Sequence, residues 1–241
     1  MRWRLANDRT LPLVGVLIGI GAARAVAAEP PVIVAVPQGG SAPGSAEQRR
    51  DFQANEFRRY EKGAGWAYYR IVEDASGQQA IRASYEPGMP TITLAVGVPE
   101  NLRERAARVR WRWRVQTFPN GGDECKKKAA DSAAVVYLMF KSRLTWYSLK
   151  YVWSSVGKKG AVCDKQRFFV TDQDTIILES GGATNEWREE EVDLRREFRE
   201  HFKGGDADAH VPDFVGIGIM SDGDNTRSPS SADYAGVAII Y

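Results

Sequence analysis

Oxygen-bearing side chains gather in the stretch SDGDNT, which stands shortly before the final apolar run YAGVAIIY. Asp222, Asp224 and Asn225 offer the carboxylate and amide oxygens that a hard cation such as calcium prefers. Asp233 follows closely, and like charges repel unless a cation or a hydrogen-bond donor lies between them. The same residue types also form turns by accepting bonds from nearby backbone N–H groups. Two interpretations stay open, a calcium or ligand site or a polar turn between strands, and the turn is slightly favoured.

Catalysis by paired carboxylates is a second kind of chemistry that the composition allows. Asp131, Glu179 and Glu186 are available as acid and base for glycoside hydrolysis, although no motif recommends them. Nucleophilic catalysis has less support, because the chain has no GxSxG and only His201 or His210 to orient a nucleophile. We therefore lean towards a protein without catalytic activity and keep Asp131 as a candidate ligand-contacting residue.

Aromatic residues in the run WYSLKYVW are candidates for contact with a flat ligand. In a strand, Tyr147, Tyr151 and Trp153 share one face, and Ser148, Lys150 and Val152 share the other. Three aromatics on one face form either a buried core, which we favour, or a stacking platform. Trp146 begins the run and is the indole we expect to be exposed. Trp146, Tyr151 and Trp153 are thus our aromatic ligand-binding candidates.

Strict alternation marks the stretch VRWRWRV. Trp111 and Trp113 project to one side of a strand, and Arg110, Arg112 and Arg114 to the other. We predict that the tryptophans fill a core and that the arginines meet solvent or acidic residues on neighbouring strands. The alternative is a groove in which indoles stack on sugars or arginines bind an anionic polymer.

Two cysteines, Cys125 and Cys163, bear on the compartment. In an exported protein an even pair is more often a disulfide than two free thiols, so we predict a Cys125–Cys163 disulfide. A metal site is the weaker alternative, because neither cysteine has another Cys or a His at ligand spacing.

The first 28 residues have the pattern of a secretory signal peptide. Three arginines precede the apolar run LPLVGVLIGIGAA, and small residues follow it, so we expect cleavage after Ala27 or Ala28. The run is too short to span a bilayer as a helix, and no later segment is long enough. Cleavage after Ala27 removes four Arg and one Asp, which leaves 29 Lys and Arg against 30 Asp and Glu. We expect a periplasmic or secreted, nearly neutral protein without the basic field that favours nucleic acid.

The mature chain divides into a linker and one domain. Residues 29–56 are rich in Pro, Gly, Ser and Ala, which predicts a flexible linker. Residues 57–241 contain nine or more short strand-like runs separated by turn signals, which predicts an all-β sandwich or barrel. The stretch DLRREFREHFKGG is the exception, because Leu194, Phe198 and Phe202 recur at helical spacing before Gly204.

The ordered set of short motifs from residue 57 to residue 241 resembles the bacterial domain-of-unknown-function family 3047. The pieces that carry the resemblance are WRWRV, GGDE, AADSAAVVYLMF, YVWSS, Trp187 with VDLRREF, and SDGDNT before YAG. The resemblance implies an exported β-sandwich of jelly-roll type with one short helix, and it implies no activity. Two positions depart from the family pattern: Ser132 stands after Asp131, and Val237 after Gly236, where the family often has Asp. Each departure removes a carboxylate that a shared metal or catalytic role would need.

From these features we predict a non-catalytic binding protein for a glycan or another envelope-associated ligand. Two alternatives from other classes remain. The first is a carbohydrate-active hydrolase or lyase with paired carboxylates, which should converge in a cleft beside aromatic residues. The second is a structural envelope protein that docks another protein, which should present a flat apolar patch.

Overall fold

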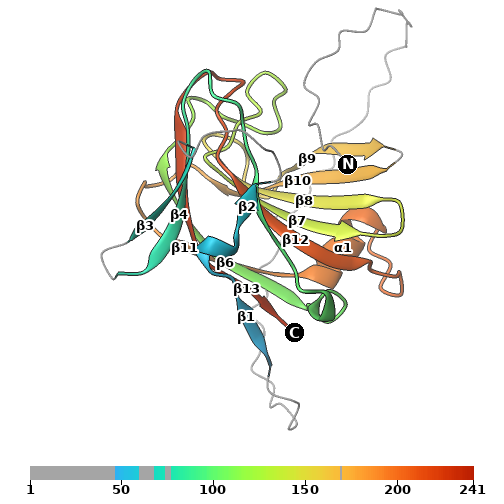
Figure 1. Cartoon of the computed structure of the whole chain (residues 1–241). Helices are drawn as coiled ribbons and strands as arrows, with labels where there is room; N and C mark the ends of the chain where they lie inside the picture. Colours follow the sequence, from blue (N-terminus) through green and yellow to red (C-terminus); the bar gives the residue numbers. More distant parts are fainter. Residues whose placement is uncertain (1–46, 60–67, 74–76, 169) are drawn as a thin grey trace, which may run out of the picture. The chain divides into compact units, whose positions relative to one another are not determined.

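A computed structural model describes residues 47–59, 68–73, 77–168 and 170–241, and within them the strands form two sheets. Sheet A has the order β11-β6-β13-β4-β3, with β1 also paired to β13, and sheet B has the order β2-β5-β12-β7-β8-β10-β9 (Figure 1). The strands of sheet A are β1 (Arg49–Asp51), β3 (Tyr69–Glu73), β4 (Gln79–Tyr85), β6 (Arg108–Thr117), β11 (Arg188–Asp193) and β13 (Ser230–Ile240). Those of sheet B are β2 (Arg58–Arg59), β5 (Leu94–Gly97), β7 (Ala134–Lys141), β8 (Trp146–Ser154), β9 (Val162–Phe168), β10 (Thr171–Ser180) and β12 (Asp213–Met220). The fold is the predicted all-β sandwich of jelly-roll type.

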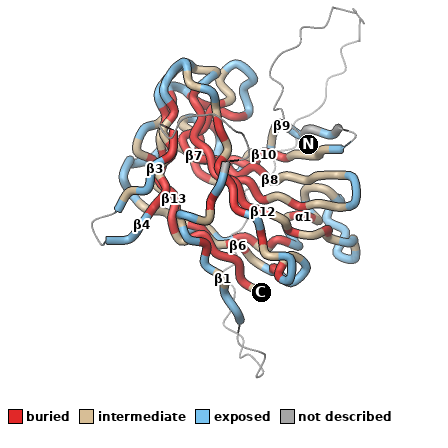
Figure 2. Tube along the Cα trace, viewed as in Figure 1, coloured by how far each residue is buried: buried red, intermediate tan, exposed pale blue. Residues whose placement is uncertain are grey.

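The core lies between the two sheets and is dominated by aromatic residues. Trp111 and Trp113 of β6 are fully buried, and their rings lie 5.8 Å from those of Tyr151 and Trp153 of β8 across the sandwich. Figure 2 shows this buried layer in red along the central strands of both sheets. The alternation in VRWRWRV thus acts as predicted, with indoles inside.

The outer face of sheet A carries the arginines of the same strand, and they meet acidic residues. Arg110 donates to Glu191 on β11, and Arg114 donates to Asp233 on β13 at 2.8 Å. Arg82 donates to both oxygens of Asp233, whose side chain is fully buried. Arg110 and Arg114 are thus engaged in ion pairs, whereas Arg112 donates to the Gln78 side chain and lies over the Trp187 ring.

One α-helix, α1 (Leu194–Phe202), covers part of the inner face of sheet B. The Asp193 carboxylate caps its start by accepting from Arg196 N at 2.8 Å. Phe198 is fully buried against Phe140 and Tyr147, with ring centroids 5.1 and 5.0 Å apart. The predicted apolar stripe is therefore what holds the helix on the sheet. Two short 3-10 helices, η1 (Ala54–Glu56) and η2 (Glu100–Leu102), complete the described elements.

The folded chain begins earlier than the sequence predicts. β1 and η1 lie inside residues 29–56, where we expected a flexible linker. β1 pairs with β13 through Arg49↔Ile240, Arg50↔Ile239 and Asp51↔Ala238, so the C-terminal end of that range is structured. The expected signal peptide and the rest of the linker lie outside the described residues.

Two further features concern the whole chain. Cys125 and Cys163 form the predicted disulfide, which joins the loop before β7 to the edge strand β9. Within the described residues, no helix has the length and apolar character needed to cross a membrane.

Candidate functional site

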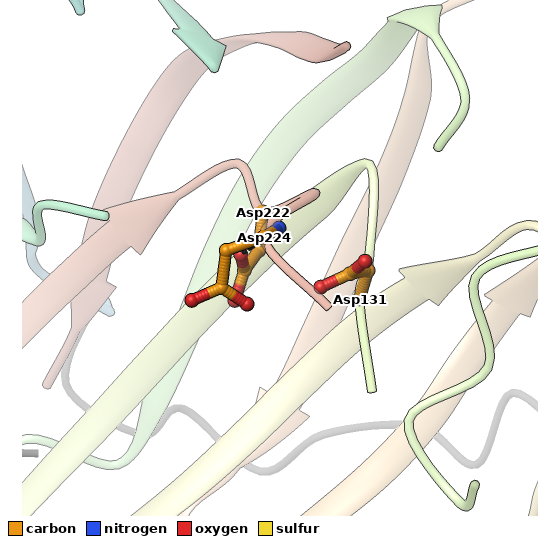
Figure 3. Close-up of side chains that lie close together, drawn as sticks. All are labelled: Asp131, Asp222 and Asp224. Carbon is orange, nitrogen blue, oxygen red and sulfur yellow. Dashed lines mark hydrogen bonds between the residues drawn. The ribbon is translucent and has the colours of Figure 1, made fainter. Parts of the chain in front are cut away.

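Three carboxylates meet where the loop after β12 passes the segment that leads into β7. Asp222 and Asp224 stand on the loop, and Asp131 stands on the facing segment (Figure 3). The Asp222 N–H donates to the Ser132 carbonyl at 2.9 Å, which fixes the two segments side by side. One carboxylate oxygen from each residue lies within 4.8 Å of those from the other two. We call Asp131, Asp222 and Asp224 the acidic cluster.

Asp131 organises the loop. Its Oδ1 accepts from the backbone N–H and the side-chain amide of Asn225, at 3.1 and 3.3 Å, and its Oδ2 accepts from Thr226 N at 2.6 Å. The side chain is fully buried. Both carboxylate oxygens of Asp131 therefore accept hydrogen bonds from N–H groups of the loop, as those of a turn-forming carboxylate do.

Asn225 contributes its amide donor, not its oxygen, to the acidic cluster. Its Nδ2 donates to Asp224 Oδ1 at 2.7 Å as well as to Asp131, so it lies between two like charges. Asp222 Oδ1 in turn accepts from Asp224 N at 3.2 Å. These bonds are the local turn that the sequence favoured. A calcium site would use the oxygens of the acidic cluster, whereas Asn225 would have to turn its amide to join it.

Electrostatics make Asp222 the unusual member. Burial above all, together with the neighbouring charges of Asp224 and Asp131, raises its pKa to about 7 against a lowering effect of Lys150. Burial and the Asp131 charge also raise the pKa of Asp224, which is more exposed. The acidic cluster therefore holds more negative charge than its surroundings readily accommodate.

A buried ion pair that the sequence did not single out lies beside the acidic cluster. Lys150 Nζ is 2.9 Å from both carboxylate oxygens of Glu124, and both residues are buried. Burial alone would lower the Lys150 pKa, but Glu124, then Tyr137 and Asp222, outweigh that effect and raise it. The sequence signal for this ion pair was a lysine between the apolar residues Leu149 and Tyr151 of a strand. Strand alternation places Lys150 on the face opposite Tyr151, but it does not show that the loop with Glu124 covers that face.

Tight packing holds the loop in place. The Tyr68 hydroxyl donates to the Ser221 carbonyl. A Cβ at Gly223 would lie 2.1 Å from the Ser228 carbonyl oxygen and 2.9 Å from the Tyr85 ring, so only glycine fits there. The loop thus has little freedom to rearrange, and the positions of Asp222 and Asp224 are set by the fold.

The ligand-binding role predicted for Tyr151 and Trp153 is contradicted by their burial. Both rings are buried against sheet A, Tyr151 donates to Glu197 beneath α1, and Trp153 Nε1 donates to the Gly181 carbonyl. The platform fails because sheet A covers that face, as the favoured core interpretation held. Trp146 is half-buried at the other end of β8, about 23 Å along the strand from Trp153, with Lys141 over its ring. Trp146 therefore belongs to a different region from the acidic cluster.

The other carboxylates and histidines named from the sequence also lie apart. Asp233 points to the outer face of sheet A, Glu179 pairs with Lys159 and Arg188, and His201 Nδ1 lies 3.0 Å from the buried Asp174. Of the predicted ligand-binding residues, the structure brings together Asp131, Asp222, Asp224 and Asn225.

A family model matches residues 56–238, which is most of the chain, and its description is "Protein of unknown function (DUF3047)". The chain belongs to this family. The match covers the strand and loop motifs that carried the resemblance, including the acidic cluster. No curated protein sequence matches the chain.

Several solved structures match the chain at low identity. The endoglucanase cel12A from Rhodothermus marinus is 10% identical, with 82% of this chain and 99% of that chain covered and a TM-score of 0.41. The xyloglucanase domain of NopAA from Sinorhizobium fredii is 9% identical over 79% and 96%, with a TM-score of 0.41. The family 11 carbohydrate-binding module of Lic26A-Cel5E from Clostridium thermocellum is 9% identical over 80% and 86%, with a TM-score of 0.36. We draw nothing about fold or activity from a likeness of this degree.

Proposed function

We propose that this member of the family is an exported, non-catalytic binding protein for a glycan or another envelope-associated ligand, located in the periplasm or secreted. In this proposal the acidic cluster and Asn225 contact the ligand. One observation carries it. Three carboxylates converge within 4.8 Å, and Lys150, the cation that acts on Asp222, is itself paired with Glu124.

The energetic argument follows from Asp222. A buried carboxylate with a pKa of about 7 is destabilised in its charged form at neutral pH. Hydroxyl groups of a sugar can donate hydrogen bonds to Asp222 and Asp224, and a divalent cation can neutralise them, so either ligand would relieve the repulsion. Since Asp224 is exposed, it is the member that a ligand reaches first.

Calcium is the cation we propose, because all ligands that the acidic cluster offers are hard oxygens. We expect calcium to raise the thermal unfolding midpoint of the wild-type protein relative to a chelator. The gain is about 2.7 kcal/mol at a hundredfold excess over the dissociation constant. The Asp224→Ala variant should lose the gain, while Asp208→Ala, which removes an exposed carboxylate elsewhere, should keep it. An unchanged wild-type midpoint would overturn the calcium proposal.

Glycan binding is tested separately by affinity electrophoresis against soluble bacterial polysaccharides and by pull-down with insoluble ones. We expect retardation by at least one polysaccharide, and we expect Asp224→Ala to weaken it and Asp208→Ala to leave it unchanged. Failure to bind any of the panel in the presence and absence of calcium would contradict the binding function.

A carbohydrate-active enzyme is the second candidate, and the Asp222 pKa favours it. A carboxyl group that titrates near 7 suits a general acid at neutral pH. The spacing of the acidic cluster is also near the roughly 5 Å that separates the carboxyls of retaining glycosidases. An assay for new reducing ends or unsaturated products decides between the two. If wild type forms product and Asp222→Asn does not, the protein is an enzyme and the non-catalytic binding function is rejected.

A further inference from the structure

A cavity of about 430 Å³ lies in sheet A, where β4 and β1 part from β13. β13 pairs with β4 from Ser230 to Tyr234 and with β1 from Ala238 to Ile240. The register of β13 with β6 shifts between Ala235 and Ala238, and Gly236 has a φ of +60°, so the strand is irregular at this point. Residues 235–237 therefore pair with neither β4 nor β1, and they line the cavity.

The N-terminal segment closes the other side of the cavity. Phe52 N donates to the Val237 carbonyl at 2.8 Å, which anchors the chain between β1 and η1 against β13. Gln53 N is in turn fixed by Glu56 Oε2 at 2.7 Å. The volume falls within the range of about 300–1,000 Å³ that is usual for small-molecule sites.

The lining of the cavity separates into an apolar floor and an amide rim. Phe52, Phe57, Ile81 and Tyr234 are buried and form the floor. Three exposed glutamines, Gln53, Gln78 and Gln79, stand at the rim. A site of this kind combines an apolar floor for the C–H groups of a ligand with amides that both donate and accept hydrogen bonds.

The charge of the rim is nearly balanced. Asp51 is the acidic residue of the lining, and Arg49 Nη2 lies 2.6 Å from it. Arg112 donates to the Gln78 side chain and is not itself part of the lining. An anionic or cationic ligand would find no uncompensated partner charge there, whereas a neutral polar ligand meets amides.

We infer that this cavity, which we name the amide cavity, binds a short uncharged saccharide through its glutamine rim and apolar floor. The amide cavity shares no residue with the acidic cluster. The inference thus extends glycan recognition to a second place in the fold and does not depend on the acidic cluster.

The test uses three neutral disaccharides as probes: cellobiose, maltose and N,N′-diacetylchitobiose. Binding to the full mature chain is measured by saturation-transfer NMR and calorimetry at millimolar concentration. We expect at least one probe to bind. Gln53→Ala and Gln79→Ala should each weaken binding by roughly fivefold, since a lost hydrogen bond is worth about 1 kcal/mol. Ala54→Trp, which places a large side chain at the cavity wall, should abolish binding.

The controls separate this inference from the proposed function. Gln48→Ala removes an exposed glutamine of the same segment outside the cavity and should leave binding unchanged, as should Asp208→Ala, which lies outside both the cavity and the acidic cluster. The thermal unfolding midpoint of each variant is compared with that of wild type, so that a folding defect is recognised. If Ala54→Trp proves unstable, Gln53→Ala tests the site in its place. Absence of binding by all three probes overturns the inference. Binding that survives Ala54→Trp and Gln53→Ala but is lost in Asp224→Ala also overturns it and assigns the saccharide to the acidic cluster.

Discussion

Asp131 and Asp233 show how far single residues can be assigned from sequence. Asp233 stands near SDGDNT in the chain, yet strand alternation turns it to the outer face of sheet A, where Arg82 and Arg114 bind it. Asp131 is 94 residues from Asn225 and nevertheless accepts its amide. The sequence identified the acidic loop, whereas long-range strand pairing decided which carboxylate joins it. No local pattern encodes that choice.

The Asp222 pKa leads to a prediction about pH. In the folded chain this pKa is about 7, above the ordinary aspartate value of 3.8, so between these values the folded state binds more protons than the unfolded state. The free energy of unfolding should therefore fall as pH rises from about 4 to about 7, and this contribution should level off above 7. Asp222→Asn should remove the slope and make the protein more stable than wild type at pH 8, by roughly 1–4 kcal/mol.

Urea denaturation of both proteins at a series of pH values measures the effect. Asp208→Asn, at an exposed position, serves as the control and should keep the wild-type slope. Parallel pH profiles for wild type and Asp222→Asn would show that Asp222 does not titrate in this range.

At the scale of elements, period-two patterns give the two faces of a strand but not which face is covered. In β6 the pattern sufficed, because a face of tryptophans must be buried. In β8 both faces are buried, one by sheet A and one in part by the loop that carries Glu124. The ligand-binding role of Tyr151 and Trp153 failed for this reason.

The loop between β6 and β7 is held at several points, and the disulfide is one of them. Ser155 N and Val156 N donate to the Gly122 carbonyl, Glu124 pairs with Lys150, and Cys125 is bonded to Cys163. The double variant Cys125→Ser/Cys163→Ser should lower the free energy of unfolding by about 4 kcal/mol on the chain-entropy model. Because Asp131 follows in the same loop, amide exchange at Asn225 and Thr226 should become faster.

Hydrogen exchange with mass spectrometry, together with denaturant unfolding, checks this prediction. The amides of β4 provide the internal reference, because β4 lies in sheet A, where it pairs with β3 and β13. Equal acceleration in β4 and in the loop after β12 would indicate global destabilisation and contradict a local role.

For the whole molecule, the sandwich class followed from the sequence, while its N-terminal limit did not. β1 has the sequence RRD, without any apolar residue, and is stabilised by backbone pairing with β13. Hydrophobic periodicity cannot reveal such a strand, because its stability does not come from burying its own side chains. β1 also precedes the range matched by the family model.

Export gives a prediction at the same scale. If residues 1–28 are a signal peptide, the protein recovered from the cell envelope or medium begins at Ala28 or Glu29 and contains one disulfide. Intact-mass measurement with and without reduction reads both features, since reduction adds two hydrogens. Recovery of the uncleaved chain from the cytoplasm alone would contradict the expected location.

The place of β13 in sheet A has a consequence for the order in which the chain acquires its structure. β13 is the last strand in sequence, yet it pairs with β1, β4 and β6. Until it emerges from the ribosome or the export channel, three strands of sheet A lack the neighbour that joins them, and the tryptophans of β6 lack a complete sheet. Contacts between such distant segments form slowly. If the chain is exported as proposed, we therefore expect it to stay unfolded, and so able to thread through a narrow translocation pore, until β13 has crossed.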